Sequence, residues 1–120
     1  MLAGALIIES LRVGVVIDDL GIVVRRLSRA APTFVTPDQP AVWTLLEFRS
    51  DSADPDLLAE TLAGALDSPG WYANFDSDGQ VYVVFPGKVF RYSRDDDARH
   101  ESALAYARTV GVPPEQCDWR

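Results

Sequence analysis

The stretch NFDSDGQVYVVFPGKVFRY, residues 74–92, decides the fold. Its apolar runs are rich in β-branched and aromatic residues, which suit the pleated, partly buried surface of a sheet. Two clusters of turn-forming residues, DSDG and PG, separate these runs. The stretch therefore predicts three consecutive antiparallel strands joined by hairpins, with the first strand beginning at Trp71.

The length of the first turn fixes which side chains share a face of this sheet. If residues 77–79 form a three-residue loop with Gly79 left-handed, Phe75 lies opposite Val81 and Asp76 opposite Gln80. Every apolar side chain then falls on one face, whereas a four-residue loop would mix apolar and polar residues. We therefore predict the three-residue loop.

The second turn, Pro86-Gly87, suits a two-residue hairpin, because proline presets φ and glycine accepts a positive φ. The expected cross-strand pairs are Val83 with Phe90, Val81 with Tyr92, Tyr82 with Arg91 and Val84 with Val89.

The first turn also fits the opening of a calcium-binding EF-hand loop, apart from Asn74 in place of the first aspartate. The twelfth position, which carries a bidentate glutamate in an EF-hand, is Phe85 here. The residues on both sides of the turn also have the pattern of strands, whereas helices flank an EF-hand loop. We therefore expect a hairpin, with no metal site and no cofactor.

A strand is favoured at residues 22–29, where the pattern also fits a helix. Another strand is predicted at residues 42–50, where side-chain types alternate. A helix is predicted after Asp54, a favourable N-cap followed by proline, with Leu58, Leu62, Ala65 and Leu66 on one face. A second helix follows Asp95, Asp96 and Asp97 and stops at Gly111 and Pro113.

These elements predict an α+β fold in a single domain, residues 1–120. We expect an antiparallel sheet of about five strands with both helices on one face, in the order β-β-α-β-β-β-α. Residues 1–21 are of uncertain structure, with an extra strand at residues 6–13 as one option.

Composition limits the classes of function. The chain has a net charge of −7, and thirteen of its 18 acidic side chains follow residue 50. This charge disfavours nucleic acid and anionic membranes as partners and suits a basic protein partner. The apolar opening is interrupted by Glu9, Arg12, Asp18 and Asp19, so it predicts neither a signal peptide nor a membrane span. A single cysteine, Cys117, fits a reducing cytoplasm.

With both helices on one face, the other face of the sheet would be wetter and would carry Tyr72, Asn74, Tyr82 and Arg91. Together with His100, these residues form the candidate interaction or ligand face. His100 could also act as a general base, although a single helical histidine is more often a surface residue. No recognisable nucleophile motif is present, so no catalytic residue is assigned.

Other notable residues have a structural interpretation as well as a functional one. The cluster Arg25, Arg26 and Arg29 could contact an anion or an acidic partner, or it could protect a strand edge. Cys117 is expected to pack. The tail, residues 112–120, is expected to fold back and bury Trp119 beside the second helix.

The motifs GWYANF, VYVVFPGKVFRY and GVPPEQCDW resemble those of a family of small actinomycete-type bacterial proteins of unknown function. The resemblance covers residues 42–119 and implies a compact bacterial cytoplasmic domain, without any catalytic residue. Cys117 stands where an aliphatic residue is expected in that family.

Two classes of function follow from these patterns. The first is a non-enzymatic protein-interaction or accessory module, acting as a homodimer or on a protein partner. The alternative is a small-molecule-binding protein or enzyme with a pocket between the sheet and the tail. A deep pocket with convergent polar groups favours the alternative, and a flat aromatic face favours the first class.

Overall fold

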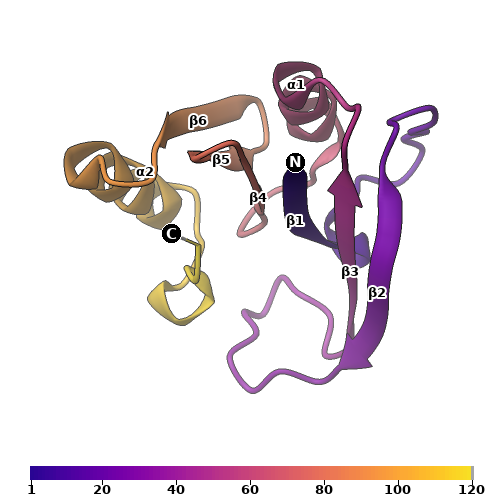
Figure 1. Ribbon diagram of the computed structural model, residues 1–120. Coiled ribbons are helices and arrows are strands. Elements are labelled where there is room, and N and C mark those ends of the chain that lie inside the picture. Colours follow the sequence, from indigo (N-terminus) through magenta and orange to yellow (C-terminus); the bar gives the residue numbers. More distant parts are fainter. Residues whose placement is uncertain (120) are drawn as a thin grey trace.

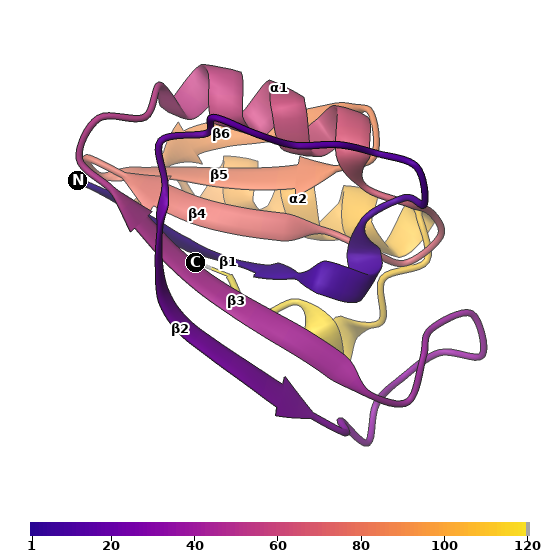
Figure 2. The ribbon, with the colours of Figure 1, turned by 90° about the vertical axis from the view of Figure 1, so that its right-hand side faces the viewer.

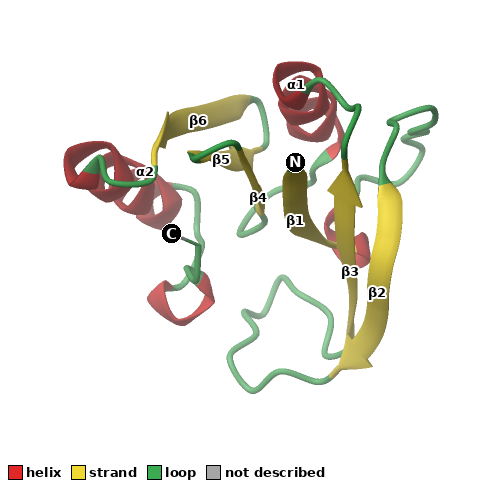
Figure 3. Ribbon diagram, viewed as in Figure 1, coloured by secondary structure: helices red, strands yellow, loops and turns green. Residues whose placement is uncertain are grey.

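The computed structural model describes residues 1–119. Within them lies one six-stranded antiparallel sheet in the order β2-β3-β1-β4-β5-β6 (Figures 1 and 3). Its strands are β1 (Leu2–Ile7), β2 (Val23–Ala30), β3 (Trp43–Ser50), β4 (Ala73–Ser77), β5 (Gln80–Phe85) and β6 (Lys88–Ser93). The helices are α1 (Pro55–Ala65), α2 (Asp97–Thr109) and the short 3-10 turns η1 (Ile8–Ser10) and η2 (Pro114–Gln116). The predicted α+β class is confirmed.

The strand count differs from the prediction because the N-terminal segment supplies a sixth strand. β1 starts at Leu2 and lies in the middle of the sheet, between β3 and β4, instead of spanning residues 6–13. A side chain on Gly4 would collide with Phe75, since the added Cβ would lie 2.3 Å from the Cβ of that residue. This glycine therefore permits the close approach of β1 to β4.

The two helices lie on opposite faces of the sheet, so the prediction of a shared face is wrong. α1 packs through Leu58 and Leu62 against a cluster that includes Phe75 and Tyr82. α2 packs through Ala103 and Ala107 against a second cluster, which contains Val81, Val83 and Phe85. Successive residues of a strand point to opposite faces, and in Figure 1 strands β5 and β6 pass between the two helices.

The register of the first hairpin differs from the prediction by one residue. Ser77 pairs with Gln80 and Phe75 with Tyr82, so the loop contains only Asp78 and Gly79. Both loop residues have positive φ, at 49° and 80°, as a two-residue type I′ turn requires. The prediction assumed one buried face. Because β5 is buried on both faces, its apolar alternation does not distinguish the registers.

The second hairpin and the helix ends agree with the predictions. β5 and β6 pair in the expected register, including Val83 with Phe90 and Tyr82 with Arg91. The Asp54 carboxylate accepts hydrogen bonds from the first-turn amides of α1, and Asp96 caps α2. The strand predicted at residues 22–29 is β2, shifted by one residue to Val23–Ala30, and β3 lies where a strand was predicted at residues 42–50.

Trp119 folds back onto the second helix, as predicted. Its side chain is 3% exposed, and its indole Nε1 donates to the Tyr92 hydroxyl at 2.9 Å. The tail and α2 cover one face of β5 and β6. The same face of β1, β2 and β3 carries no α-helix, and the candidate site lies there. No helix within residues 1–119 has the length and hydropathy needed to cross a bilayer.

Candidate functional site

A half-open groove of about 510 Å³ lies on the uncovered part of the sheet. Its floor consists of residues that share one face of the central strands, namely Ala5, Ile7, Leu45 and Asn74. The loop of residues 31–42 borders the groove on one side. Residues 115–118 of the tail border it on the other.

Aromatic rings form the apolar wall of the groove. The ring centroids of Phe34 and Trp43 are 6.0 Å apart in an edge-to-face arrangement, and those of Trp43 and Trp71 are 5.3 Å apart. Trp43 is held by a hydrogen bond from Nε1 to the Pro40 carbonyl at 3.0 Å. Such a wall offers planar faces to an apolar chain or to a cation.

Tyr72 joins the sheet to the tail at the rim. Its hydroxyl contacts the Asp118 carboxylate at 2.7 Å and also the Gln116 carbonyl. Burial, together with the hydrogen bond to Asp118 and its negative charge, raises the pKa of Tyr72 well above its usual value. The phenol therefore stays protonated near neutral pH and serves as a donor instead of a general base.

A buried pair of glutamines fixes the two borders of the groove. The Gln39 amide donates to Gln116 Oε1 at 3.2 Å, and the Gln116 amide donates to Gln39 Oε1 at 2.8 Å. Gln39 also donates to the Gly70 carbonyl, and Gln116 donates to the Phe34 carbonyl. Because both amides are satisfied, the loop and the tail are tied into one rigid frame.

Three carboxylates line the groove, and no lysine, arginine or histidine does among the described residues. Glu47 is neutralised by Arg25 at 2.8 Å and Arg26 at 3.8 Å. Glu115 and Asp118 form no ion pair within residues 1–119. The groove thus combines an aromatic wall with two carboxylates at one rim that have no ion-pair partner in the described part of the chain.

The predicted ligand face is divided between the two sides of the sheet. Tyr72 and Asn74 line the groove, whereas Tyr82 and Arg91 lie on the α1 side. The one-residue change in register explains this, since it moves Tyr82 to the face opposite Asn74.

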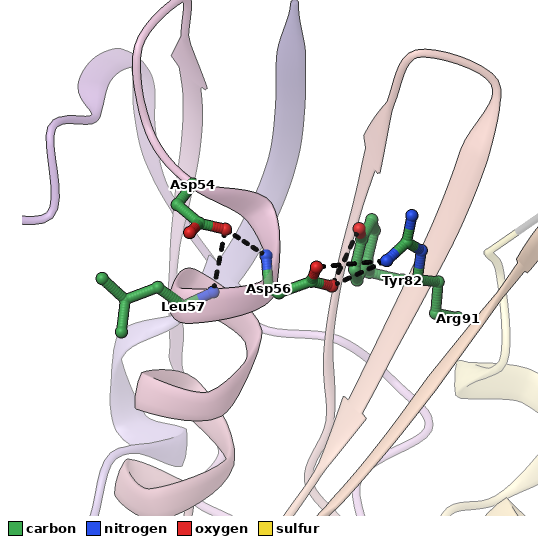
Figure 4. A network of polar contacts seen from close by, with 5 residues as sticks. All are labelled: Asp54, Asp56, Leu57, Tyr82 and Arg91. Atoms are coloured by element: carbon green, nitrogen blue, oxygen red, sulfur yellow. Dashed lines mark hydrogen bonds and ion pairs between the residues drawn. The ribbon is translucent and has the colours of Figure 1, made fainter.

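Tyr82 and Arg91 bind the first turn of α1 (Figure 4). The Tyr82 hydroxyl donates to Asp56 at 3.2 Å, and Arg91 Nη1 donates to both oxygens of the same carboxylate at 3.1 Å. Burial and the nearby Asp56 charge raise the pKa of Tyr82. Tyr82 is 1% exposed, so its side chain anchors the helix and lies out of reach of a ligand.

His100 also lies outside the groove. Its Nδ1 is 3.1 Å from the Tyr92 hydroxyl, and its ring contacts Trp119 edge to face. The Cys117 thiol contacts the Pro113 carbonyl and packs beside the α2 cluster, as expected for a packing cysteine. Burial raises the pKa of Cys117, which lowers its reactivity.

Within residues 1–119 no group of three or more histidine, cysteine, aspartate or glutamate side chains could hold a metal ion. The aspartates of the first turn have other contacts. Asp76 pairs with Arg94 at 2.7 Å, and Asp78 lies in the loop itself.

Gln39, Trp43 and Glu115 were not among the predicted site residues, because nothing local marks a buried glutamine or a groove wall. Gln116 and Asp118 do stand in the closing motif GVPPEQCDW, and that motif was the available signal. No protein-family model, curated protein or solved structure matches the chain. The resemblance to small actinomycete proteins therefore stays a prediction.

Proposed function

We propose that this protein is a non-enzymatic binding module whose groove holds a basic, partly apolar segment of a protein partner. The observation that carries the proposal is an aromatic wall beside the carboxylates of Glu115 and Asp118, which have no ion-pair partner within residues 1–119. A lysine or arginine side chain fits such a site, because its stem packs on rings while its charge meets a carboxylate.

The overall charge supports the same kind of partner. A net charge of −7 attracts basic segments over a Debye length and raises the rate of encounter. The rigid Gln39–Gln116 frame lowers the entropic cost of binding, since the groove walls are already fixed. We place this activity in a reducing cytoplasm, which suits the single thiol.

The test is the binding of an eight-residue peptide of alternating arginine and leucine. Changes in the NMR chemical shifts of the protein would measure the binding and locate it. The largest shifts are expected at Trp43, Tyr72 and residues 115–118. The double variant Glu115→Gln/Asp118→Asn should weaken binding about two- to thirtyfold, because each of the two exposed ion pairs contributes about 0.2–1 kcal/mol.

A matched control separates the groove from general charge attraction. Glu60→Gln/Glu101→Gln removes the same two charges from exposed positions on the helices and should leave the affinity nearly unchanged. Equal losses in the two double variants, or shifts remote from the groove, would overturn the proposal.

The volume of the groove favours a second candidate, a small-molecule-binding protein. About 510 Å³ lies within the usual range of ligand pockets, about 300–1,000 Å³. The same wall and rim would suit a small organic cation. Micromolar binding of an aromatic or alkyl amine, with the alternating peptide failing to bind, would favour this candidate.

A further inference from the structure

The strand β2 forms an open edge of the sheet. It pairs with β3 from Val23 to Ala30, apart from a bulge at Arg25, and no described strand lies beyond it (Figure 2). An edge strand presents a row of backbone donors and acceptors that can pair with another extended chain.

β2 also exposes apolar side chains to solvent. Val23 and Val24 are 54% exposed and Leu27 is 61% exposed. A strand that only closes the sheet would gain nothing from three large apolar side chains in water. Their exposure indicates a surface that another chain covers.

Charge identifies the chemistry of that chain. Arg25, Arg26 and Arg29 lie on this edge, and the first two share the single carboxylate of Glu47. The side chains of Arg25 and Arg26 remain 58% and 68% exposed. This edge is thus a basic strip on an otherwise acidic protein, opposite in sign to the groove rim.

We propose that β2 pairs with an extended acidic segment of a protein partner, which adds a seventh strand to the sheet. Backbone hydrogen bonds give affinity in this mode of recognition, and alternate side chains give specificity. Arg26 shares the groove face with Ser28, whereas Val24 and Leu27 share the α1 face. The matching segment alternates carboxylate and aliphatic side chains.

A second copy of the chain is a poorer match for this edge. Antiparallel pairing about Arg26 would set that arginine opposite its own counterpart, and like charges directly opposite destabilise a sheet. Three arginines on each edge would also repel one another at neighbouring registers.

The test uses a blocked eight-residue peptide of alternating valine and glutamate, with valine and lysine as the control peptide. The acidic peptide is expected to bind despite the net negative charge of the protein and to slow amide exchange in β2. The lysine peptide is expected to leave the exchange of β2 amides unchanged.

Matched variants locate the charge effect. Arg25→Gln/Arg26→Gln, which removes the two arginines that reach Glu47 on the groove face, should weaken binding of the acidic peptide at least about threefold. Arg99→Gln/Arg108→Gln, which removes two exposed charges from α2, should leave this binding unchanged. Glu115→Gln/Asp118→Asn should leave this binding intact, so the test is independent of the proposed groove function.

Two results would overturn the inference. One is an acidic peptide that protects no β2 amide. The other is a concentration-dependent dimer of the free protein with protection confined to β2, because a second copy would then occupy the edge.

Discussion

At the residue scale, a few side chains make contacts with residues that are distant in the sequence. Glu9 is an example, since it joins η1 to the start of β3. Its carboxylate accepts from the Thr44 amide at 2.6 Å and from the Thr44 hydroxyl at 2.8 Å. Burial alone would raise the pKa of Glu9, but these hydrogen bonds lower it below its usual value.

The lowered pKa of Glu9 predicts a pH dependence of stability. A carboxylate with a depressed pKa stabilises the fold above its unfolded value of 4.5, and this contribution is lost as pH falls through the folded value. Wild type should exceed Glu9→Gln in unfolding free energy at neutral pH, and the gap should close on acidification. Urea titrations at several pH values would measure this, and Thr44→Val should narrow the gap.

Gly79 provides a second prediction at this scale. Its φ of 80° strains a β-branched residue although the space around its Cβ position is open. Gly79→Val should cost more than about 1 kcal/mol of unfolding free energy. Gly79→Asn should retain most of the wild-type stability, because asparagine tolerates positive φ. Near-equal denaturant midpoints for Gly79→Val and wild type would contradict the turn geometry.

At the scale of elements, the local signals were sufficient for the second hairpin and for the helix ends. The hairpin from β5 to β6 and the caps of both helices follow directly from Pro86-Gly87, Asp54 and Asp96. The position of β1 did not follow, because Ala3, Gly4 and Ala5 at its centre carry little strand propensity. Only its partners β3 and β4, both remote in sequence, make it a strand.

The β1–β4 contact predicts a large effect from one methyl group. Gly4→Ala places a Cβ 2.3 Å from Phe75 Cβ and 2.4 Å from the Asn74 carbonyl oxygen. Neither atom can rotate away, so the strands must separate, at a cost of about 2 kcal/mol or more. Chemical denaturation measures the loss. Gly64→Ala, with nothing within 4 Å, should instead stabilise α1 slightly.

At the scale of the whole molecule, the tail completes both the second cluster and the groove. Trp119 packs against Tyr72 with ring centroids 4.9 Å apart and also contacts Phe85. Gln116, only three residues earlier, ties the tail to the loop of residues 31–42. Core packing and groove geometry therefore depend on the same short segment.

Truncation after Pro114 should lower the unfolding free energy by about 2–4 kcal/mol, through loss of the buried tryptophan. Thermal and urea unfolding would measure this loss. Glu115→Gln changes an exposed position of the same segment, and this variant should have the same unfolding midpoints as wild type. If the truncated chain is as stable as the full one, Trp119 has no role in the core.

The sequence by itself determined the α+β class, the second hairpin, the helix ends and the return of Trp119, because each depends on local backbone preferences or on a strongly apolar side chain. Tertiary structure alone decided the register of the first hairpin, the faces of the helices and the groove. A strand buried on both faces carries no alternation to fix its register. The Gln39–Gln116 pair joins residues 77 positions apart, which only the folded chain brings together.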